Sequence, residues 1–134
     1  MKRFSFAKSK RLVSNRQFKA VLARKLRVSN GLFTLFMAEN DCGHPRLGLS
    51  VGKSCGNAVV RNRLKRLARE AFRQSQSQIP GGFDYLLMIS PQASKKCQFS
   101  IFNCQFVRAS FLALVSDAVR KIRQEDKNNN QFSV

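Results

Sequence analysis

One segment gives this chain its character: Gly56-Asn57-Ala58-Val59-Val60-Arg61-Asn62-Arg63-Leu64-Lys65-Arg66-Leu67-Ala68-Arg69-Glu70-Ala71-Phe72-Arg73. Wound as an α-helix at about 100° per residue, it separates into two faces, with Asn57 placed to cap the first turn. The apolar face gathers Val60, Leu64, Leu67, Ala68, Ala71 and Phe72. The polar face gathers Asn62, Arg63, Lys65, Arg66, Arg69 and Arg73, with Arg61 at the border. The segment therefore predicts an amphipathic helix that packs on a core through one side.

The polar face of this predicted helix carries almost one sign of charge. Between residues 57 and 73, six basic residues are accompanied by a single acid, Glu70. Exposed helices usually mix charge signs because like charges repel, so such a face is better suited to phosphate than to water alone. The alternative for these residues is an ordinary solvated face. For Arg61 alone, a further alternative is that it anchors the helix to the preceding loop. We favour a nucleic-acid partner.

The whole chain is strongly basic. Its 134 residues contain 25 Lys and Arg against 7 Asp and Glu, a net charge of +18, and residues 1–27 hold ten bases and no acid. Such self-repulsion is relieved by a polyanion, which leaves nucleic acid or an anionic membrane as the partner. A peripheral membrane protein needs apolar residues free to insert, whereas the apolar face here is needed for a core. No apolar run is long enough to span a bilayer.

The length and patterning predict one small α+β domain. Residues 1–14 read as a basic flexible arm, 15–123 as the folded core and 124–134 as a disordered tail. Helices are expected near 15–24, 57–73 and 105–123, and strands over 31–39, 46–52 and 84–89, with 92–103 irregular. The expected order is helix, two strands or three, helix, strand, helix. We expect an α/β sandwich of about four strands with three helices.

Catalysis by the protein's own side chains is not indicated. His44 is the single histidine, the seven acids are scattered, and no phosphate-binding loop precedes a helix. Cys42 and His44 are spaced as metal ligands, but no second pair completes a zinc site. Glu39 and Asp41 could coordinate a metal, although hairpin ends are often acidic for solubility alone. The four cysteines suit reduced thiols in a cytoplasmic protein. We expect a binding module without catalytic or metal-ligating residues, with a metal-dependent nuclease and a ribosomal RNA-binding protein as rivals.

A family resemblance rests on the strand, loop and basic helix in one fixed order. The residues are Gly48-Leu49-Ser50-Val51-Gly52-Lys53, then Gly56-Asn57-Ala58-Val59 and Arg61-Asn62-Arg63-Leu64-Lys65-Arg66. Together they resemble the signature of the bacterial ribonuclease P protein subunit. The likeness extends more weakly to Phe18-x-x-Val21, Asn30, Phe36 and Asp84-Tyr85, and spans roughly residues 11 to 90.

The resemblance implies a fold and a task. The fold is an α/β sandwich with a left-handed β-α-β crossover, similar to domain 2 of ribosomal protein S5. The task is to assist a catalytic RNA, which uses Mg²⁺ to cut the 5′ leader from precursor tRNA. The implied partners are that RNA and precursor tRNA, in the cytoplasm, with neither DNA nor a membrane.

The resemblance also implies site residues. Contacts to the RNA would come from Lys53, Arg61, Asn62, Arg63, Lys65, Arg66 and Arg69. Contacts to the leader would come from Phe18, Val21, Leu22 and Phe36. The chain departs from the family's usual pattern at Leu22, where an aromatic residue is common, and at Ser54, where a second base often follows Lys53.

Overall fold

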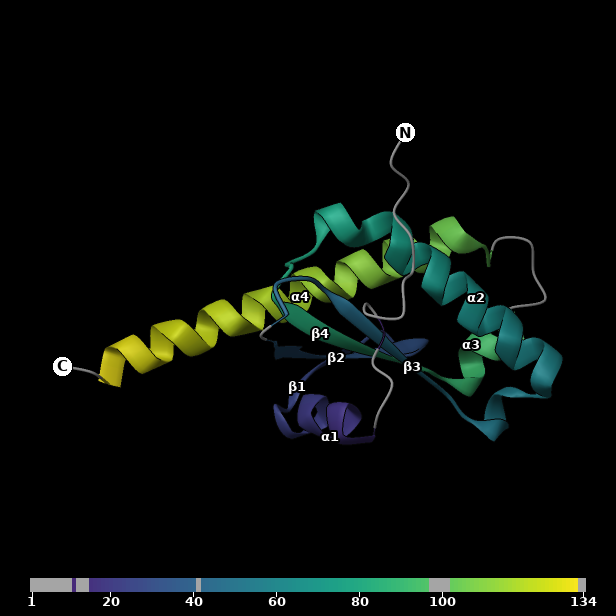
Figure 1. Ribbon diagram of the computed structural model, residues 1–134, viewed down its shortest axis with the longest axis horizontal. Helices are drawn as coiled ribbons and strands as arrows, with labels where there is room; N and C mark the ends of the chain where they lie inside the picture. The colour runs from purple at the N-terminus through teal and green to yellow at the C-terminus, as the bar shows by residue number, and fades with distance from the viewer. Residues whose placement is uncertain (1–10, 12–14, 41, 97–101, 133–134) are drawn as a thin grey trace.

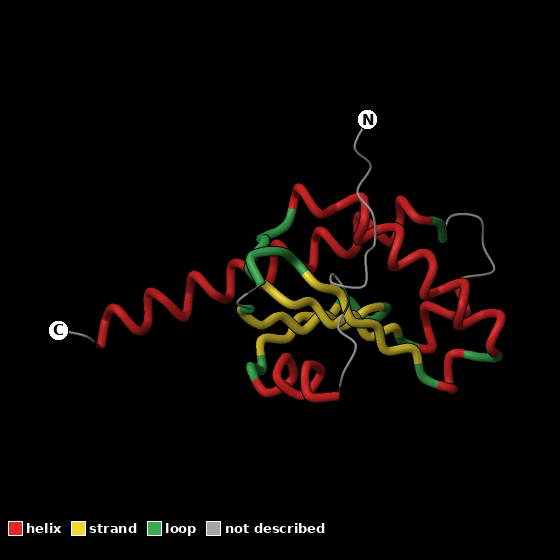
Figure 2. The backbone as a smooth tube through the Cα atoms, viewed as in Figure 1, coloured by secondary structure: helices red, strands yellow, loops and turns green. Residues whose placement is uncertain are grey.

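The computed structural model describes residues 11, 15–40, 42–96 and 102–132, which form three layers (Figure 1). The helices are α1 (Asn15–Ala23), α2 (Ala58–Ser75), α3 (Pro91–Lys96) and α4 (Cys104–Phe132), with 3₁₀ turns η2 (Lys53–Cys55) and η3 (Gln76–Gln78). The strands are β1 (Leu26–Ser29), β2 (Phe33–Glu39), β3 (Arg46–Val51) and β4 (Phe83–Ile89). As Figure 2 shows, α1 covers one face of the sheet, and α2 and α4 cover the other.

The sheet has the order β1-β2-β4-β3. β1 pairs with β2, and β2 with β4, in antiparallel fashion, whereas β3 and β4 are parallel neighbours. Two adjacent parallel strands need a crossover connection, and α2 supplies it. The predicted α+β sandwich, with four strands, three main helices and a β-α-β crossover, is confirmed.

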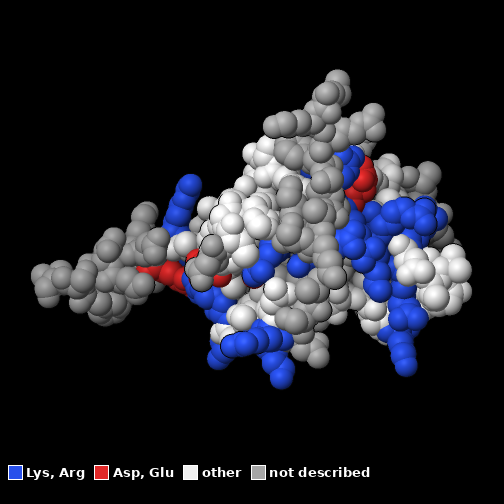
Figure 3. Space-filling view, viewed as in Figure 1, with Lys and Arg blue, Asp and Glu red and all other residues white. Residues whose placement is uncertain are grey.

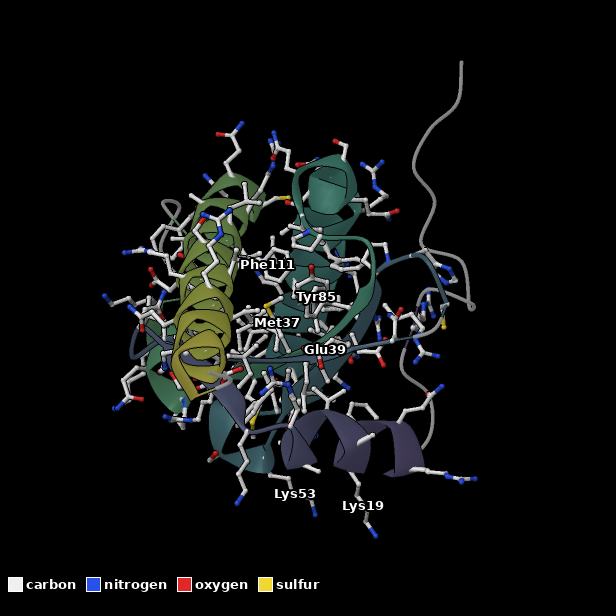
Figure 4. All side chains as sticks on the ribbon, turned by 90° about the vertical axis from the view of Figure 1, so that its left-hand side faces the viewer. Lys19, Met37, Glu39, Lys53, Tyr85 and Phe111 are labelled. Carbon is white, nitrogen blue, oxygen red and sulfur yellow. The ribbon has the colours of Figure 1, made fainter. Side chains whose placement is uncertain are left out.

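The main core lies between the sheet and the pair α2 and α4. Alternate residues of β2 and β4 face it, because successive strand side chains point to opposite sides. Three rings meet at its centre: Tyr85 lies 6.2 Å from Phe72 and 5.8 Å from Phe111, centroid to centroid. Figure 4 shows Tyr85, Phe111 and Met37 enclosed between these helices and the sheet. This packing fixes α2 against the sheet.

A smaller apolar cluster lies on the opposite face, under α1. Val21, Ala38 and Leu86 are buried there, and Phe18 and Phe36 pack against them with partial exposure. This cluster holds α1 across β2 and β4. The predicted helix at 15–24 is therefore confirmed, and its apolar side serves a second, separate core.

Two elements differ from the sequence-based expectation. The sequence left open whether two or three strands precede the basic helix. The structure has three, because β1 forms in addition to β2 and β3. The prediction of an irregular 92–103 is wrong for its first part, because α3 begins at Pro91. A proline suits the first position of a helix, since the missing N–H has no partner there in any case. Ala93 of α3 is fully buried, which ties the helix to the main core.

The last helix is longer than expected. α4 continues to Phe132, through the region predicted as a disordered tail, and its final turns project beyond the sheet (Figure 1). Arg24 fastens its projecting part: Nη2 donates to Glu125 Oε2 at 2.8 Å and Nε to Glu39 Oε2 at 3.2 Å. These hydrogen bonds raise the pKa of Arg24 and lower that of Glu125. The expectation for residues 1–14 lies outside the described residues except at Arg11, which forms an isolated bridge with Leu47.

Candidate nucleic-acid interface

The cationic helix starts from a tight turn after β3. Gly56 has φ 129°, a conformation that side chains rarely adopt, and a Cβ here would lie 3.4 Å from Val60 Cβ. Asn57 follows as the N-cap, and its side chain accepts a hydrogen bond from the Val60 N–H at 3.0 Å. Lys53 is exposed in η2, just before this turn. The loop therefore fixes where α2 begins and places Lys53 close to that start.

The predicted apolar face of α2 is the buried one. Leu64, Ala68, Ala71 and Phe72 are at most 2% exposed. This burial removes the support for a membrane-inserting helix, which would need that face free. In addition, no helix among the described residues combines the length and apolar character needed to cross a bilayer.

The predicted RNA-binding residues lie along the outer side of α2. Asn62, Arg63, Arg66 and Arg69 are exposed, whereas Arg61 and Lys65 are half-buried. Figure 3 shows Lys and Arg side chains gathered over this helix, at the right of the view. The structure thus places the whole set on one element, and Lys53 on the loop before it. We define the cationic face as Asn62, Arg63, Lys65, Arg66 and Arg69.

The acids do not neutralise the cationic face. Each carboxylate whose side chain is described pairs with an arginine outside that face: Glu39 and Glu125 with Arg24, Asp84 with Arg46, Glu70 with Arg73, and Asp117 with Arg120. The Arg73 guanidinium lowers the pKa of Glu70. Within the described part of the chain, the four bases of the cationic face form no salt bridge. Their charge is available to a polyanion.

Arg61, at the border of the cationic face, carries an unused donor. Its Nε is buried and has no hydrogen-bond partner among the described residues. A buried donor left unpaired is costly, so an acceptor that reaches this nitrogen gains more than it would at an exposed one. The half-buried position of the side chain also agrees with the anchoring alternative.

A groove opens on the other side of the sheet, beside α1. It has a volume of about 300 Å³ and is lined by Phe18, Leu22, Leu49, Ser50, Leu86 and Met88. We call it the α1 groove. Leu22 and Met88 are 41% and 37% exposed, unusually open for large apolar side chains. In Figure 4, Lys19 of α1 and Lys53 both project from the α1 side of the molecule. An apolar groove on the side from which these lysines project suits a single nucleic-acid strand.

The four residues predicted to touch a leader have different positions. Phe18 and Leu22 line the α1 groove. Phe36 is half-buried in the cluster under α1, and Val21 is fully buried, so Val21 positions the helix and offers no surface. Sequence reasoning predicted the strands of Leu49, Ser50, Leu86 and Met88 but did not assign these four residues to a binding surface. The continuous apolar run Tyr85-Leu86-Leu87-Met88-Ile89 of β4 was the signal for a second apolar face.

The candidate metal ligands are not assembled into a site. Glu39 is held by Arg24, and Asp41 lies outside the described residues. His44 Nδ1 lies 3.2 Å from the carbonyl oxygen of Cys42. No three His, Cys, Asp or Glu side chains come together within the described ranges. Because the Glu39 carboxylate is engaged by the Arg24 guanidinium, this arrangement of Glu39 does not fit a protein-held Mg²⁺.

Comparison with known proteins identifies relatives along most of the chain. A profile of the family described as Ribonuclease P matches residues 6–111. The ribonuclease P protein component of Nitrosococcus oceani is 39% identical over 105 residues, which cover 78% of this chain and 87% of the relative. That of Brevibacillus brevis is 45% identical over 85 residues, covering 63% and 68%.

Solved structures give the same result. The RNase P protein of Staphylococcus aureus aligns with a TM-score of 0.71 and 28% identity, over 83% of this chain and 96% of that one. The RNase P protein of Thermotoga maritima aligns with a TM-score of 0.71 and 30% identity, over 78% and 94%. The chain, with its strand, glycine turn and cationic helix, therefore belongs to the bacterial ribonuclease P protein family.

Proposed function

We propose that α2 binds the catalytic RNA of ribonuclease P and that the α1 groove receives the 5′ leader of precursor tRNA. Family membership gives the process, the 5′ maturation of tRNA, in which this chain is the protein component of an endoribonuclease. It also implies partnership with the ribonuclease P RNA. The observation that supports the role of α2 most strongly is its row of cations without carboxylate partners. Such a row neutralises phosphates and releases their counterions.

The proposed chemistry belongs to the RNA. Hydrolysis of one phosphodiester bond is carried out by the catalytic RNA with Mg²⁺. This chain positions the precursor tRNA relative to the catalytic RNA. The protein's described carboxylates are occupied by arginines, which supports this division. We place the activity in the cytoplasm, and the free thiols of Cys42, Cys55 and Cys104 suit its reducing conditions.

Reconstitution tests the proposed function. The purified protein alone should leave precursor tRNA uncut, and it should raise the rate of cleavage by the catalytic RNA at limiting Mg²⁺. The measurement is the release of the labelled leader with protein alone, RNA alone, and both. Cleavage by the protein alone that is abolished by Glu39→Gln would instead support the metal-dependent nuclease. A protein that binds the RNA but never changes the cleavage rate would support a purely structural role.

The α1 groove is tested by Phe18→Ala. Removal of a ring that lines the groove should reduce affinity for precursor tRNA by about tenfold, because stacking on an aromatic side chain contributes about 1–3 kcal/mol per base. Affinity for mature tRNA, which lacks the leader, should change little. Binding of both RNAs to the reconstituted complex is compared by titration. Phe106→Ala, another half-buried phenylalanine but on α4, is the matched control. Equal losses for precursor and mature tRNA would reject a leader-binding groove.

A further inference from the structure

A second hollow with cations lies at the sheet edge opposite α2. β1 is the edge strand there, and α4 runs along it. Between them is a groove of about 380 Å³ lined by Val28, Ser29, Asp117, Arg120, Lys121 and Gln124. This volume is in the range of ligand-binding clefts, about 300–1,000 Å³. α2 packs on β3 at the other edge, so three strand spacings, about 14 Å, separate the two surfaces.

The backbone of β1 is open toward this groove. Lys121 Nζ donates a hydrogen bond to the carbonyl oxygen of Arg27 at 2.7 Å, so this carbonyl points away from β2. In an antiparallel ladder, the N–H and C=O of one residue point the same way, and the orientation repeats two residues later. The N–H groups of Arg27 and Ser29 therefore also face the edge. Backbone donors and side-chain cations are combined at one place.

Two exposed cations flank the edge from opposite sides. Arg27 pairs with Phe36 in the register, which puts its side chain on the α1 face, whereas Lys121 reaches the edge from α4. Both are exposed, and within the described residues neither forms a salt bridge. A strand that lies along the edge can contact both cations.

The charge balance of the groove favours an anion. Its single carboxylate, Asp117, is already paired with Arg120. Two lining cations, Arg120 and Lys121, against one carboxylate leave a net charge of +1 (2 − 1), and Arg27 adds a further cation on the α1 face of the same edge strand. The nearby acid Glu125 is held by Arg24 and does not compensate this charge. Charge-assisted hydrogen bonds from such groups are the ones that hold phosphate oxygens.

We propose that Arg27, Arg120 and Lys121, the edge site, bind the phosphate backbone of a second segment of the catalytic RNA. The inference rests on the proposed function, which supplies that RNA as the partner. The leader is not the occupant, because the α1 groove lies on the β3 side of α1 and the edge site lies on the β1 side. A large folded RNA can reach both edges of the sheet, so the protein binds it at two places, α2 and the edge site.

The test compares two single-charge losses on α4. Lys121→Gln removes an edge-site cation, whereas Arg123→Gln removes an exposed cation that lines a different hollow on the same helix. Because each lost phosphate contact lowers the slope of log affinity against log salt by about 0.7–0.9, Lys121→Gln should lower it by roughly that amount. Arg27→Gln combined with Lys121→Gln should lower the slope by about twice as much and the affinity by about tenfold. The catalytic RNA, free of substrate, is the ligand titrated.

Control variants and additional measurements complete the test of the edge site. Lys121→Arg keeps the charge and should bind as the unchanged protein does, which separates charge from folding, and thermal unfolding is followed for each variant. An unchanged slope in the double variant, or an equal loss in Arg123→Gln, overturns the edge site. Precursor tRNA is titrated in a parallel measurement, and a loss confined to it assigns the groove to the substrate and overturns the edge site. An α2 variant is titrated alongside: if it loses binding while the edge variant does not, only the edge site fails, and if neither changes, the proposed role of α2 fails.

Discussion

Replacement of Arg63, Arg66 and Arg69 together by glutamine is expected to weaken binding of the catalytic RNA by roughly a thousandfold. A hydrogen bond to a charged group contributes about 1.5–3 kcal/mol, and each 1.4 kcal/mol is about tenfold in affinity. All three side chains are exposed and none is paired with a carboxylate in the described residues, so the fold loses nothing with them. Lys65 is left in place because it is half-buried.

Binding is measured by titration at several salt concentrations. The slope of log affinity against log salt should become less steep by about 2–3, since each phosphate contact contributes about 0.7–0.9. The matched control replaces the same three residues by lysine, which keeps the charge and should preserve the slope while it loses the two-donor geometry of arginine. Circular dichroism should show unchanged thermal unfolding for both variants. Unfolding of the glutamine variant would mean that the cationic face is structural, and a flat salt response of the unchanged protein would contradict phosphate binding.

Asp84→Ala is expected to lower the free energy of unfolding by about 3 kcal/mol, because loss of one partner leaves a largely buried charge unpaired. Asp84 Oδ1 and Oδ2 each lie 2.7 Å from a guanidinium nitrogen of Arg46, and Asn40 Nδ2 donates to Oδ1 at 2.8 Å. The two charged side chains are only 8% and 18% exposed. The pair joins β3 to β4, the two strands that contribute most of the α1 groove.

Urea unfolding measures this loss. Asp117→Ala breaks an arginine pair whose side chains are 50% and 71% exposed, and it should cost less than about 1 kcal/mol. The double variant Asp84→Leu and Arg46→Met removes both charges and should recover most of the lost stability. Equal small losses of unfolding free energy for Asp84→Ala and Asp117→Ala would show that the buried pair stabilises the fold no more than an exposed pair does.

The sequence alone predicted the cationic helix well because its two faces are chemically distinct over many turns. The N-cap at Asn57 and the burial of Leu64 and Phe72 follow directly from that pattern. β1 was harder, since Leu26 and Val28 alternate with polar residues over only four positions. The turn before it is made by Lys25 with φ 61°, and lysine carries no turn signal.

The α1 groove could be predicted only in part, because β2 and β4 are apolar on both faces. Phe33 and Phe36 look alike in such a run, yet Phe33 is 2% exposed in the main core and Phe36 lies under α1. No local pattern states which side a helix will cover. The pairing of the acids with arginines was also beyond sequence reasoning, since Arg24 reaches Glu125 across 101 positions.

The crossover that carries α2 has a consequence for selectivity. The helix is fixed at its start by η2 after β3 and at its end by η3 before β4, so its cations keep constant spacings. From Arg61 to Arg73 they extend over about 18 Å, at about 1.5 Å per residue. An unstructured transcript has to become ordered to match that rigid array, whereas a folded ribozyme already presents phosphates at set distances. Such a scaffold discriminates between RNA architectures of equal charge without reading a single base.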